Sequence, residues 1–160
     1  MGSTADNVTK GSCICGALRY EYTGDPAMTA LCHCLSCRKI GAGSTTFTLA
    51  IPSPNFHFTS PSSSSSSSPG STHKNFTVTH ESGIRLKTHF CGECGTFVAK
   101  EGAGENEFPG LMIVNAGTVD GEGVFEKLAP PQAELWVKHR VGWEGERHGL
   151  MQCAGFPDGL

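Results

Sequence analysis

Three cysteines, Cys32, Cys34 and Cys37, lie within six residues, and Arg38 and Lys39 follow them directly. A disulfide between close neighbours such as these would be strained, because the side chains of alternate residues diverge in an extended chain. Metal ligation fits the spacing better. Three thiolates leave a tetrahedral zinc one ligand short, and an open position of this kind distinguishes a catalytic zinc from a structural one.

Four further cysteines form two pairs, Cys13 with Cys15 and Cys91 with Cys94. Together they would fill a closed four-thiolate zinc shell, which is the arrangement of a structural site. The alternative is a redox pair at Cys91 and Cys94, but no helix in a βαβ setting follows them. Cys153 is left over as an unpaired thiol near the C-terminus. The count therefore predicts one closed site, one open site and one spare cysteine.

The open site has a competing interpretation as a second structural zinc, closed by one further ligand. The candidates for that ligand are His33, His80, His89, His139 and Cys153. Arg38 and Lys39 are candidates to bind a substrate carboxylate, for which the Arg fork has the better geometry, but they also fit an ordinary solvated face. His33 is a candidate proton shuttle, although a structural position is the simpler interpretation.

Length and composition limit what these sites can belong to. The chain has 160 residues, which predicts one domain (residues 1–160) that gains from metal staples. Its net charge is −3, from 12 Lys and Arg against 15 Asp and Glu, and it has no long basic block, so no nucleic-acid partner is expected. The sequence has no signal-like apolar segment and no apolar run of membrane-spanning length. These observations predict a cytoplasmic protein without a membrane partner.

Short segments with alternating or β-branched apolar residues predict a mainly β fold. The expected strands cover residues 16–22, 45–51, 56–59, 76–80, 84–90, 96–100, 111–114 and 133–137. Residues 35–40 fit a single helical turn, and residues 60–71, which are mostly Ser, are expected to form a flexible insertion. Trp143 is expected in the core. We therefore expect one domain of short, mainly antiparallel strands in coiled sheets, with zinc sites at strand ends.

Five motifs in this order resemble the glutathione-dependent formaldehyde-activating enzyme and centromere protein V family. They are Gly11-Ser12-Cys13-Ile14-Cys15-Gly16, the segment from Cys32 to Lys39, Phe90-Cys91-Gly92-Glu93-Cys94-Gly95, Ala116-Gly117-Thr118-Val119-Asp120 and Arg140-Val141-Gly142-Trp143. The resemblance covers most of the chain. It includes the order and spacing of seven thiols, and only the Ser-rich insertion and Cys153 depart from it.

The resemblance implies a coiled, mostly antiparallel β fold with two zinc ions, one structural and one catalytic. It assigns Cys13, Cys15, Cys91 and Cys94 to the structural ion, and Cys32, Cys34 and Cys37 to the catalytic ion. It also implies carbon–sulfur lyase or synthase chemistry on adducts of glutathione, the founding reaction being the condensation of formaldehyde with glutathione. Glutathione or another small thiol adduct is then the expected substrate.

A second class of function stays open at this point: a non-catalytic, zinc-stabilised β module that binds a protein partner. The three-thiol cluster favours the enzyme, because a binding module needs no second metal site with an open position. The sequence leaves open the identity of the substrate, the direction of the reaction, the general acid or base, and the oligomeric state.

Overall fold

The structure is a computed structural model that describes residues 7–60, 71–104, 106–108, 110–128 and 130–157. Its strands form two sheets. The smaller is antiparallel and has the order β1-β2-β5, with β1 at Val8–Ser12, β2 at Arg19–Thr23 and β5 at Phe56–Phe58. In β2 the side chains of Tyr20 and Tyr22 are buried and alternate with Arg19 and Glu21, as the period of two predicts.

The larger sheet has the order β11-β10-β3-β4-β9-β8-β7-β6. Its strands are β3 (Met28–Cys32), β4 (Thr46–Pro52), β6 (His73–Thr79), β7 (Arg85–Cys91), β8 (Phe97–Gly102), β9 (Leu111–Asn115), β10 (Ala133–Leu135) and β11 (Met151–Cys153). The described residues contain two α-helices, α1 (Leu35–Gly41) and α2 (Val124–Leu128), and 3-10 turns at Ser53–Asn55, Ala116–Thr118 and Val137–His139.

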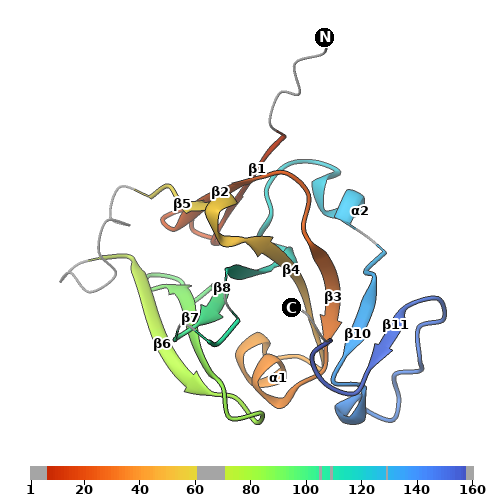
Figure 1. Cartoon of the computed structure of the whole chain (residues 1–160). Coiled ribbons are helices and arrows are strands. Elements are labelled where there is room, and N and C mark those ends of the chain that lie inside the picture. The colour runs from red at the N-terminus through yellow and green to blue at the C-terminus, as the bar shows by residue number, and fades with distance from the viewer. Residues whose placement is uncertain (1–6, 61–70, 105, 109, 129, 158–160) are drawn as a thin grey trace.

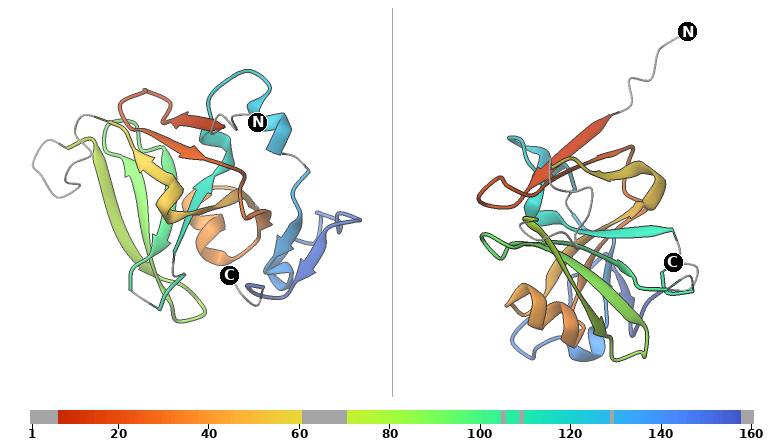
Figure 2. Two further views of the ribbon diagram at one scale, coloured as in Figure 1. Left: turned by 45° about the horizontal axis from the view of Figure 1, so that its top comes forward. Right: turned by 90° about the vertical axis from the view of Figure 1, so that its left-hand side faces the viewer.

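The smaller sheet lies across the top of the larger one in Figure 1, and the larger sheet curves so that its edge strands β6 and β11 stand on opposite sides of the view. Helix α1 lies at the end remote from the smaller sheet, between those two sides. Figure 2, in its right-hand view, shows the same separation of the small sheet from α1. The three cysteines around α1 are therefore carried at the opposite end of the molecule from β1 and β2.

Two groups of buried residues form the core. One joins the sheets and includes Tyr20 from β2, Leu49 from β4, Val98 from β8 and Val114 from β9. The other surrounds the cysteines at α1 and includes Ala133, Leu135 and Trp136. Burying apolar side chains between the layers is the main favourable contribution to folding. The second group means that the three-thiol segment is built into the core.

The expectation of a mainly β fold is confirmed, and so is the helical turn at residues 35–40, which lies within α1. Four of the helices and strands were missed: β1, β3, α2 and β11. Strand β10 pairs in parallel with both β3 and β11, whereas the other strand pairs are antiparallel. The expectation of Trp143 in the core is wrong, because its side chain is 81% exposed and Trp136 fills the core instead.

Two expectations about organisation are left as predictions. Residues 61–70 of the Ser-rich insertion lie outside the described part of the chain, while Ser60 and Ser71 at its two ends are buried. The single domain likewise stays a prediction. Within the described residues, the helices are too short and too polar for any of them to cross a membrane.

Candidate metal and active site

Four thiols from two distant segments meet at one end of the sheets. Cys13 and Cys15 follow β1, while Cys91 ends β7 and Cys94 lies in the turn before β8. The sulfur atoms lie within 4.8 Å of one another. Cys13 and Cys91 are buried, Cys94 is half-buried and Cys15 is exposed. We call this group the four-thiol cluster.

Each pair of thiols sits in a tight turn that ends in glycine. The amide of Gly16 donates to the carbonyl oxygen of Cys13 at 2.9 Å, and the amide of Gly95 donates to that of Cys91, also at 2.9 Å. Both glycines have a φ of +75°, a region that side chains with a Cβ rarely adopt. Both turns end in a glycine of the same φ, but the first hydrogen bond spans three residues and the second spans four, as the Cys-x-Cys-Gly and Cys-x-x-Cys-Gly spacings require.

The sulfur positions of the four-thiol cluster fit a zinc ion. Zinc–sulfur bonds of about 2.3 Å in a tetrahedron place the sulfur atoms about 3.8 Å apart. The structure places the sulfur of Cys15 at 3.5 Å from that of Cys13 and 3.7 Å from that of Cys91. A hydrogen bond with Thr96 lowers the pKa of Cys94 to about 5, which favours the thiolate form that binds metal.

The second group contains Cys32, Cys34 and Cys37, whose sulfur atoms also lie within 4.8 Å of one another. We call it the three-thiol cluster. Cys32 ends β3, Cys34 is the N-cap of α1, and Cys37 lies in the first turn of the helix. The sulfur of Cys34 accepts a hydrogen bond from the amide of Cys37 at 3.3 Å. All three side chains are buried, with at most 3% exposed.

A buried lysine lies against this cluster. Lys100 comes from β8, and its Nζ donates to the sulfur of Cys37 at 2.7 Å. Hydrogen bonds from Cys32 and Cys34, together with the charge of Lys100, hold the pKa of Cys37 well below its ordinary value. Burial lowers the pKa of Lys100, but the nearby sulfurs outweigh burial and raise it overall. The two shifts favour an ammonium on Lys100 and a thiolate on Cys37, in contact with each other and buried.

Sequence reasoning missed Lys100, although a signal was present. Val98 and Lys100 are two residues apart in a strand, so they face the same side of the sheet. Val98 is fully buried, and Lys100 is only 6% exposed. A lysine in an inward position needs an anionic partner, which the adjacent thiols provide.

The three-thiol cluster borders a small apolar pocket of about 30 Å³. Cys32 and Lys100 form part of its wall, and eight of its eleven lining residues are apolar. Larger hollows occur elsewhere, including one of about 420 Å³ beside β1 and α2, but they do not touch either thiol cluster. The position of the small pocket, rather than its size, connects it with the chemistry of the thiols.

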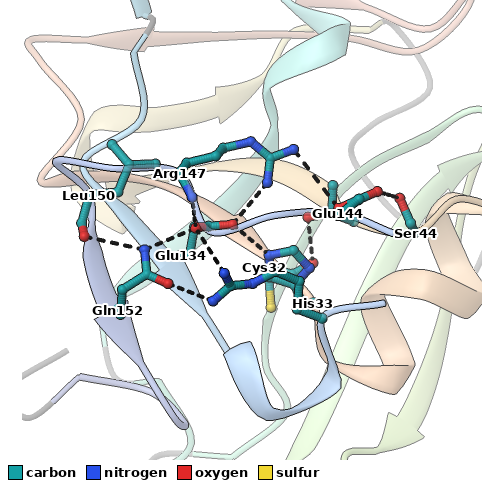
Figure 3. A network of polar contacts seen from close by, with 10 residues as sticks. Cys32, His33, Ser44, Glu134, Glu144, Arg147, Leu150 and Gln152 are labelled. Atoms are coloured by element: carbon teal, nitrogen blue, oxygen red, sulfur yellow. Dashed lines mark hydrogen bonds and ion pairs between the residues drawn. The ribbon is translucent and has the colours of Figure 1, made fainter. Parts of the chain in front are cut away.

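A buried polar network contacts the segment between Cys32 and Cys34 through the side chain of His33 (Figure 3). Glu134 of β10 is fully buried, and its carboxylate lies 3.0 Å from Nε2 of His33 and 2.8 Å from Nη1 of Arg147. It also accepts hydrogen bonds from the amide of Arg147 and from Gln152. Burial raises the pKa of Glu134, but these donors lower it to about 2, so the carboxylate is charged.

The candidate fourth ligands lie mostly away from the three-thiol cluster. His33 turns to Glu134, His89 bonds to His73 and Glu101, and His139 bonds to Glu81. His80 approaches most nearly, because a ring nitrogen lies within 4.8 Å of both the Cys34 sulfur and a Glu81 oxygen. In the described part of the chain, neither a histidine nor Cys153 joins the three thiols as a fourth ligand within that distance.

Arg38 and Lys39 lie in the last turn of α1 and line a shallow surface hollow with Leu35, Ala42 and Gly43. They do not line the pocket at Cys32. Cations at the C-terminal end of a helix also stabilise it through its dipole, which is the structural alternative for this pair. Their role in binding substrate stays a prediction.

The fold and its two groups of free thiols define a class: a mainly β protein with two separate cysteine clusters that could hold metal ions. The chain belongs to the family described as glutathione-dependent formaldehyde-activating enzyme, whose model matches residues 8–139. Those residues include all seven clustered cysteines and Lys100. Arg147, Gln152 and β11 lie beyond the match.

A solved crystal structure of a Rhodobacter sphaeroides protein has a similar fold. The TM-score is 0.52 at 19% sequence identity, and the similarity covers 76% of this chain and 96% of that one. No match was found among curated proteins. At this identity the similarity concerns the fold alone.

Proposed function

We propose that the chain is a carbon–sulfur lyase or synthase that uses two zinc ions and acts on adducts of glutathione or of another small thiol. The family match supports action on glutathione adducts. The observation that carries the proposal is the buried three-thiol cluster. It offers three sulfur ligands for a metal ion and borders both Lys100 and a pocket. All eight cysteines are free, which supports a reducing compartment such as the cytoplasm.

The two clusters take different roles in this proposal. Cys13, Cys15, Cys91 and Cys94 hold a structural zinc with a complete set of ligands. Cys32, Cys34 and Cys37 hold the catalytic zinc, which when bound lowers the pKa of a substrate thiol and so supplies a thiolate at neutral pH. The remaining chemistry falls to the residues around the pocket.

In the condensation, the substrate sulfur attacks the carbonyl carbon, a carbon–sulfur bond forms and the carbonyl π pair moves to the oxygen. That oxygen takes up one proton and the thiol has lost one, so forming the hydroxyalkyl thioether changes neither the net charge nor the number of protons. Lys100 can donate from Nζ to the developing oxyanion, because an ammonium has three donors and the described structure gives this one a single acceptor, Cys37. The reverse reaction breaks the same bond and returns the proton.

The test is the rate at which ¹³C-formaldehyde and glutathione interconvert with their adduct, measured by NMR magnetisation exchange with zinc-loaded protein. Wild type should accelerate the exchange above the rate in buffer, and Cys37→Ala should return it to that rate while remaining folded. Cys153→Ala is the matched control and should behave as wild type. A folded Cys37→Ala variant that accelerates exchange as well as wild type would overturn the proposal and leave a partner-binding module as the alternative.

A further inference from the structure

Two aromatic side chains, Phe108 and Phe156, form part of the wall of the pocket beside Cys32 and Lys100, and we call this pair of rings the closure. The rings of Phe108 and Phe156 meet edge to face with centroids 4.7 Å apart, and both line the pocket. Phe156 is held by two further rings, Trp136 and His80, each with its centroid 5.1 Å away. Phe156 is therefore fixed in place at the pocket wall by contacts on several sides.

The two aromatic residues come from parts of the chain that are separate in sequence. Phe108 lies in the connection between β8 and β9 and has a φ of +51°, a backbone conformation that is unfavourable for a bulky residue. Such strain persists only where the surroundings enforce it, and it concentrates at functional sites. Phe156 follows β11 and lies beyond residue 139, where the family match ends. One ring of the pair thus comes from within the matched residues and the other from the segment that follows them.

The size of the pocket limits what can bind next to the thiols. A volume of about 30 Å³ holds roughly two water-sized groups, since one such group needs about 10–15 Å³. The walls include Met28, Ala50 and Leu135, which offer no hydrogen-bonding side chain. A group bound there gains most if it is small and apolar.

We propose that Phe156, with Phe108, sets the size of the carbonyl compound that this site accepts. The carbon substituent of the thiol adduct enters the pocket beside Cys32, and the two rings limit it to a hydrogen or a short alkyl group. Butanal and longer aldehydes are excluded because their chains overlap the rings. This inference rests on the proposed function, which supplies the adduct.

The test compares butanal with formaldehyde as partners of glutathione, using zinc-loaded protein and the ratio of their kcat/KM values. Within one protein the ratio depends on the intrinsic reactivity of the aldehydes, but between variants that reactivity cancels. Phe156→Ala should raise the butanal-to-formaldehyde ratio at least tenfold over wild type. Phe125→Ala is the matched control, because Phe125 packs against Phe47 outside the pocket, and its ratio should equal that of wild type.

Two further variants keep the inference testable if Phe156→Ala does not fold. Phe108→Ala should raise the same ratio, since it removes the other ring of the closure. Ala50→Val should lower the acetaldehyde-to-formaldehyde ratio, because it places two methyl groups in a pocket of about that size. If the folded variants all keep the wild-type ratios, the rings do not select the substrate and the inference is wrong.

A binding measurement separates failure of the inference from failure of the proposed function. Met28 lines the pocket, so its methyl resonance, assigned through Met28→Leu, reports on occupancy. Butan-1-ol is the probe and needs no catalysis. If wild type turns over no aldehyde, the proposed function fails. A larger shift of the Met28 methyl resonance with butan-1-ol in Phe156→Ala than in wild type would still support the inference that the rings limit the size of the bound group. Equal shifts in the two proteins would overturn it.

Discussion

The two thiol clusters use the same ligand type in opposite surroundings. The four-thiol cluster joins segments 76 residues apart, Cys15 being exposed and Cys91 buried, and its one close side-chain partner in the described structure is the neutral hydroxyl of Thr96. The three-thiol cluster comes from one short segment, is buried throughout, and has the ammonium of Lys100 against Cys37. A complete ligand set suits stability, whereas an incomplete and buried set beside a charge suits chemistry.

The positions of the clusters fit this division. The four-thiol cluster connects the end of β1, in the small sheet, with the turn between β7 and β8, in the large sheet. The three-thiol cluster lies at the other end of the molecule, around α1, where it borders the pocket (Figure 1). Loss of the four-thiol cluster should therefore unfold the protein. Damage to the three-thiol cluster should lower activity while the protein stays folded.

The largest effect is expected from Cys91→Ala. A closed thiolate zinc site contributes on the order of 10 kcal/mol in small domains, which is comparable to the whole stability of a typical protein. The variant should lose its structural zinc and unfold, as measured by circular dichroism and metal analysis. Cys153→Ala is the control and should keep the wild-type melting temperature. A Cys91→Ala protein that melts at the wild-type temperature would remove the structural role of the four-thiol cluster.

Lys100→Met should lower the rate of adduct formation on the order of 100-fold and leave the melting temperature within a few degrees. Methionine keeps much of the buried volume but removes the charge that faces the developing oxyanion. Exchange NMR with formaldehyde and glutathione measures the rate. Lys87→Met, on the neighbouring strand, is the control, because Lys87 pairs with Glu101 at the surface. Unchanged turnover in Lys100→Met would exclude Lys100 from the chemistry.

Acid should weaken the part of the sheet that carries Cys91. His73 lies opposite Cys91 in the β6–β7 pair, and burial together with the nearby His89 lowers its pKa from 6.5 to about 4. Unfolded His73 binds a proton below about pH 6.5, whereas folded His73 stays neutral until about pH 4. The contribution of neutral His73 to the free energy of unfolding should thus be fully present above pH 6.5. It should fall by on the order of 3 kcal/mol between pH 6.5 and 4.

Urea unfolding of zinc-saturated protein at several pH values measures this loss. Replacement by an uncharged residue, His73→Gln, should give a flatter pH dependence than wild type, whatever its absolute stability. His57→Gln is the control, because His57 is exposed, and its pH dependence should match that of wild type. If the free energy of unfolding changes with pH by the same amount in His73→Gln and wild type, protonation of His73 does not affect stability.

The smallest effect is expected from Glu134→Gln, which removes the negative charge of the carboxylate that contacts the ring of His33. Partners of ligand-bearing segments typically affect metal affinity by 10- to 100-fold. We expect the three-thiol cluster to bind zinc about tenfold more weakly, with the four-thiol cluster unaffected, in a competition with a chelator. Glu107→Gln, whose carboxylate bonds to Arg85, is the control. Equal weakening at both clusters would point to a general loss of stability.

The sequence predicted the grouping of the thiols well, because local spacing determines it. Cys-x-Cys-Gly and Cys-x-x-Cys-Gly turns require few other residues, and the helix that begins after Cys34 brings Cys37 back to Cys34 within one turn. Alternation in β2 placed Tyr20 and Tyr22 in the core for the same reason. The mainly β class followed from such short periodic segments.

Features that depend on contacts between distant parts of the chain were not predicted from the sequence. Strand β10 was expected at residues 133–137, but its parallel pairing with β3 and β11 depends on tertiary packing. Strand β11 has three residues, too few to show a period. Lys100 gains its role from thiols 63 residues away, and Glu134 from His33 at 101 residues. Trp143 was misplaced because hydrophobicity alone does not indicate burial. Phe156 follows the missed β11, so its position at the pocket had no local signal.

The division of roles between the clusters can be tested most directly by zinc content combined with thiol binding. Wild type, Cys34→Ala and Cys94→Ala are loaded with zinc, analysed for metal and titrated with glutathione in a calorimeter. We expect two zinc ions in wild type, one in a folded Cys34→Ala that no longer binds glutathione, and loss of the fold in Cys94→Ala. A single zinc ion in wild type, or glutathione binding that survives in Cys34→Ala, would show that the two clusters do not divide into a structural and a catalytic site.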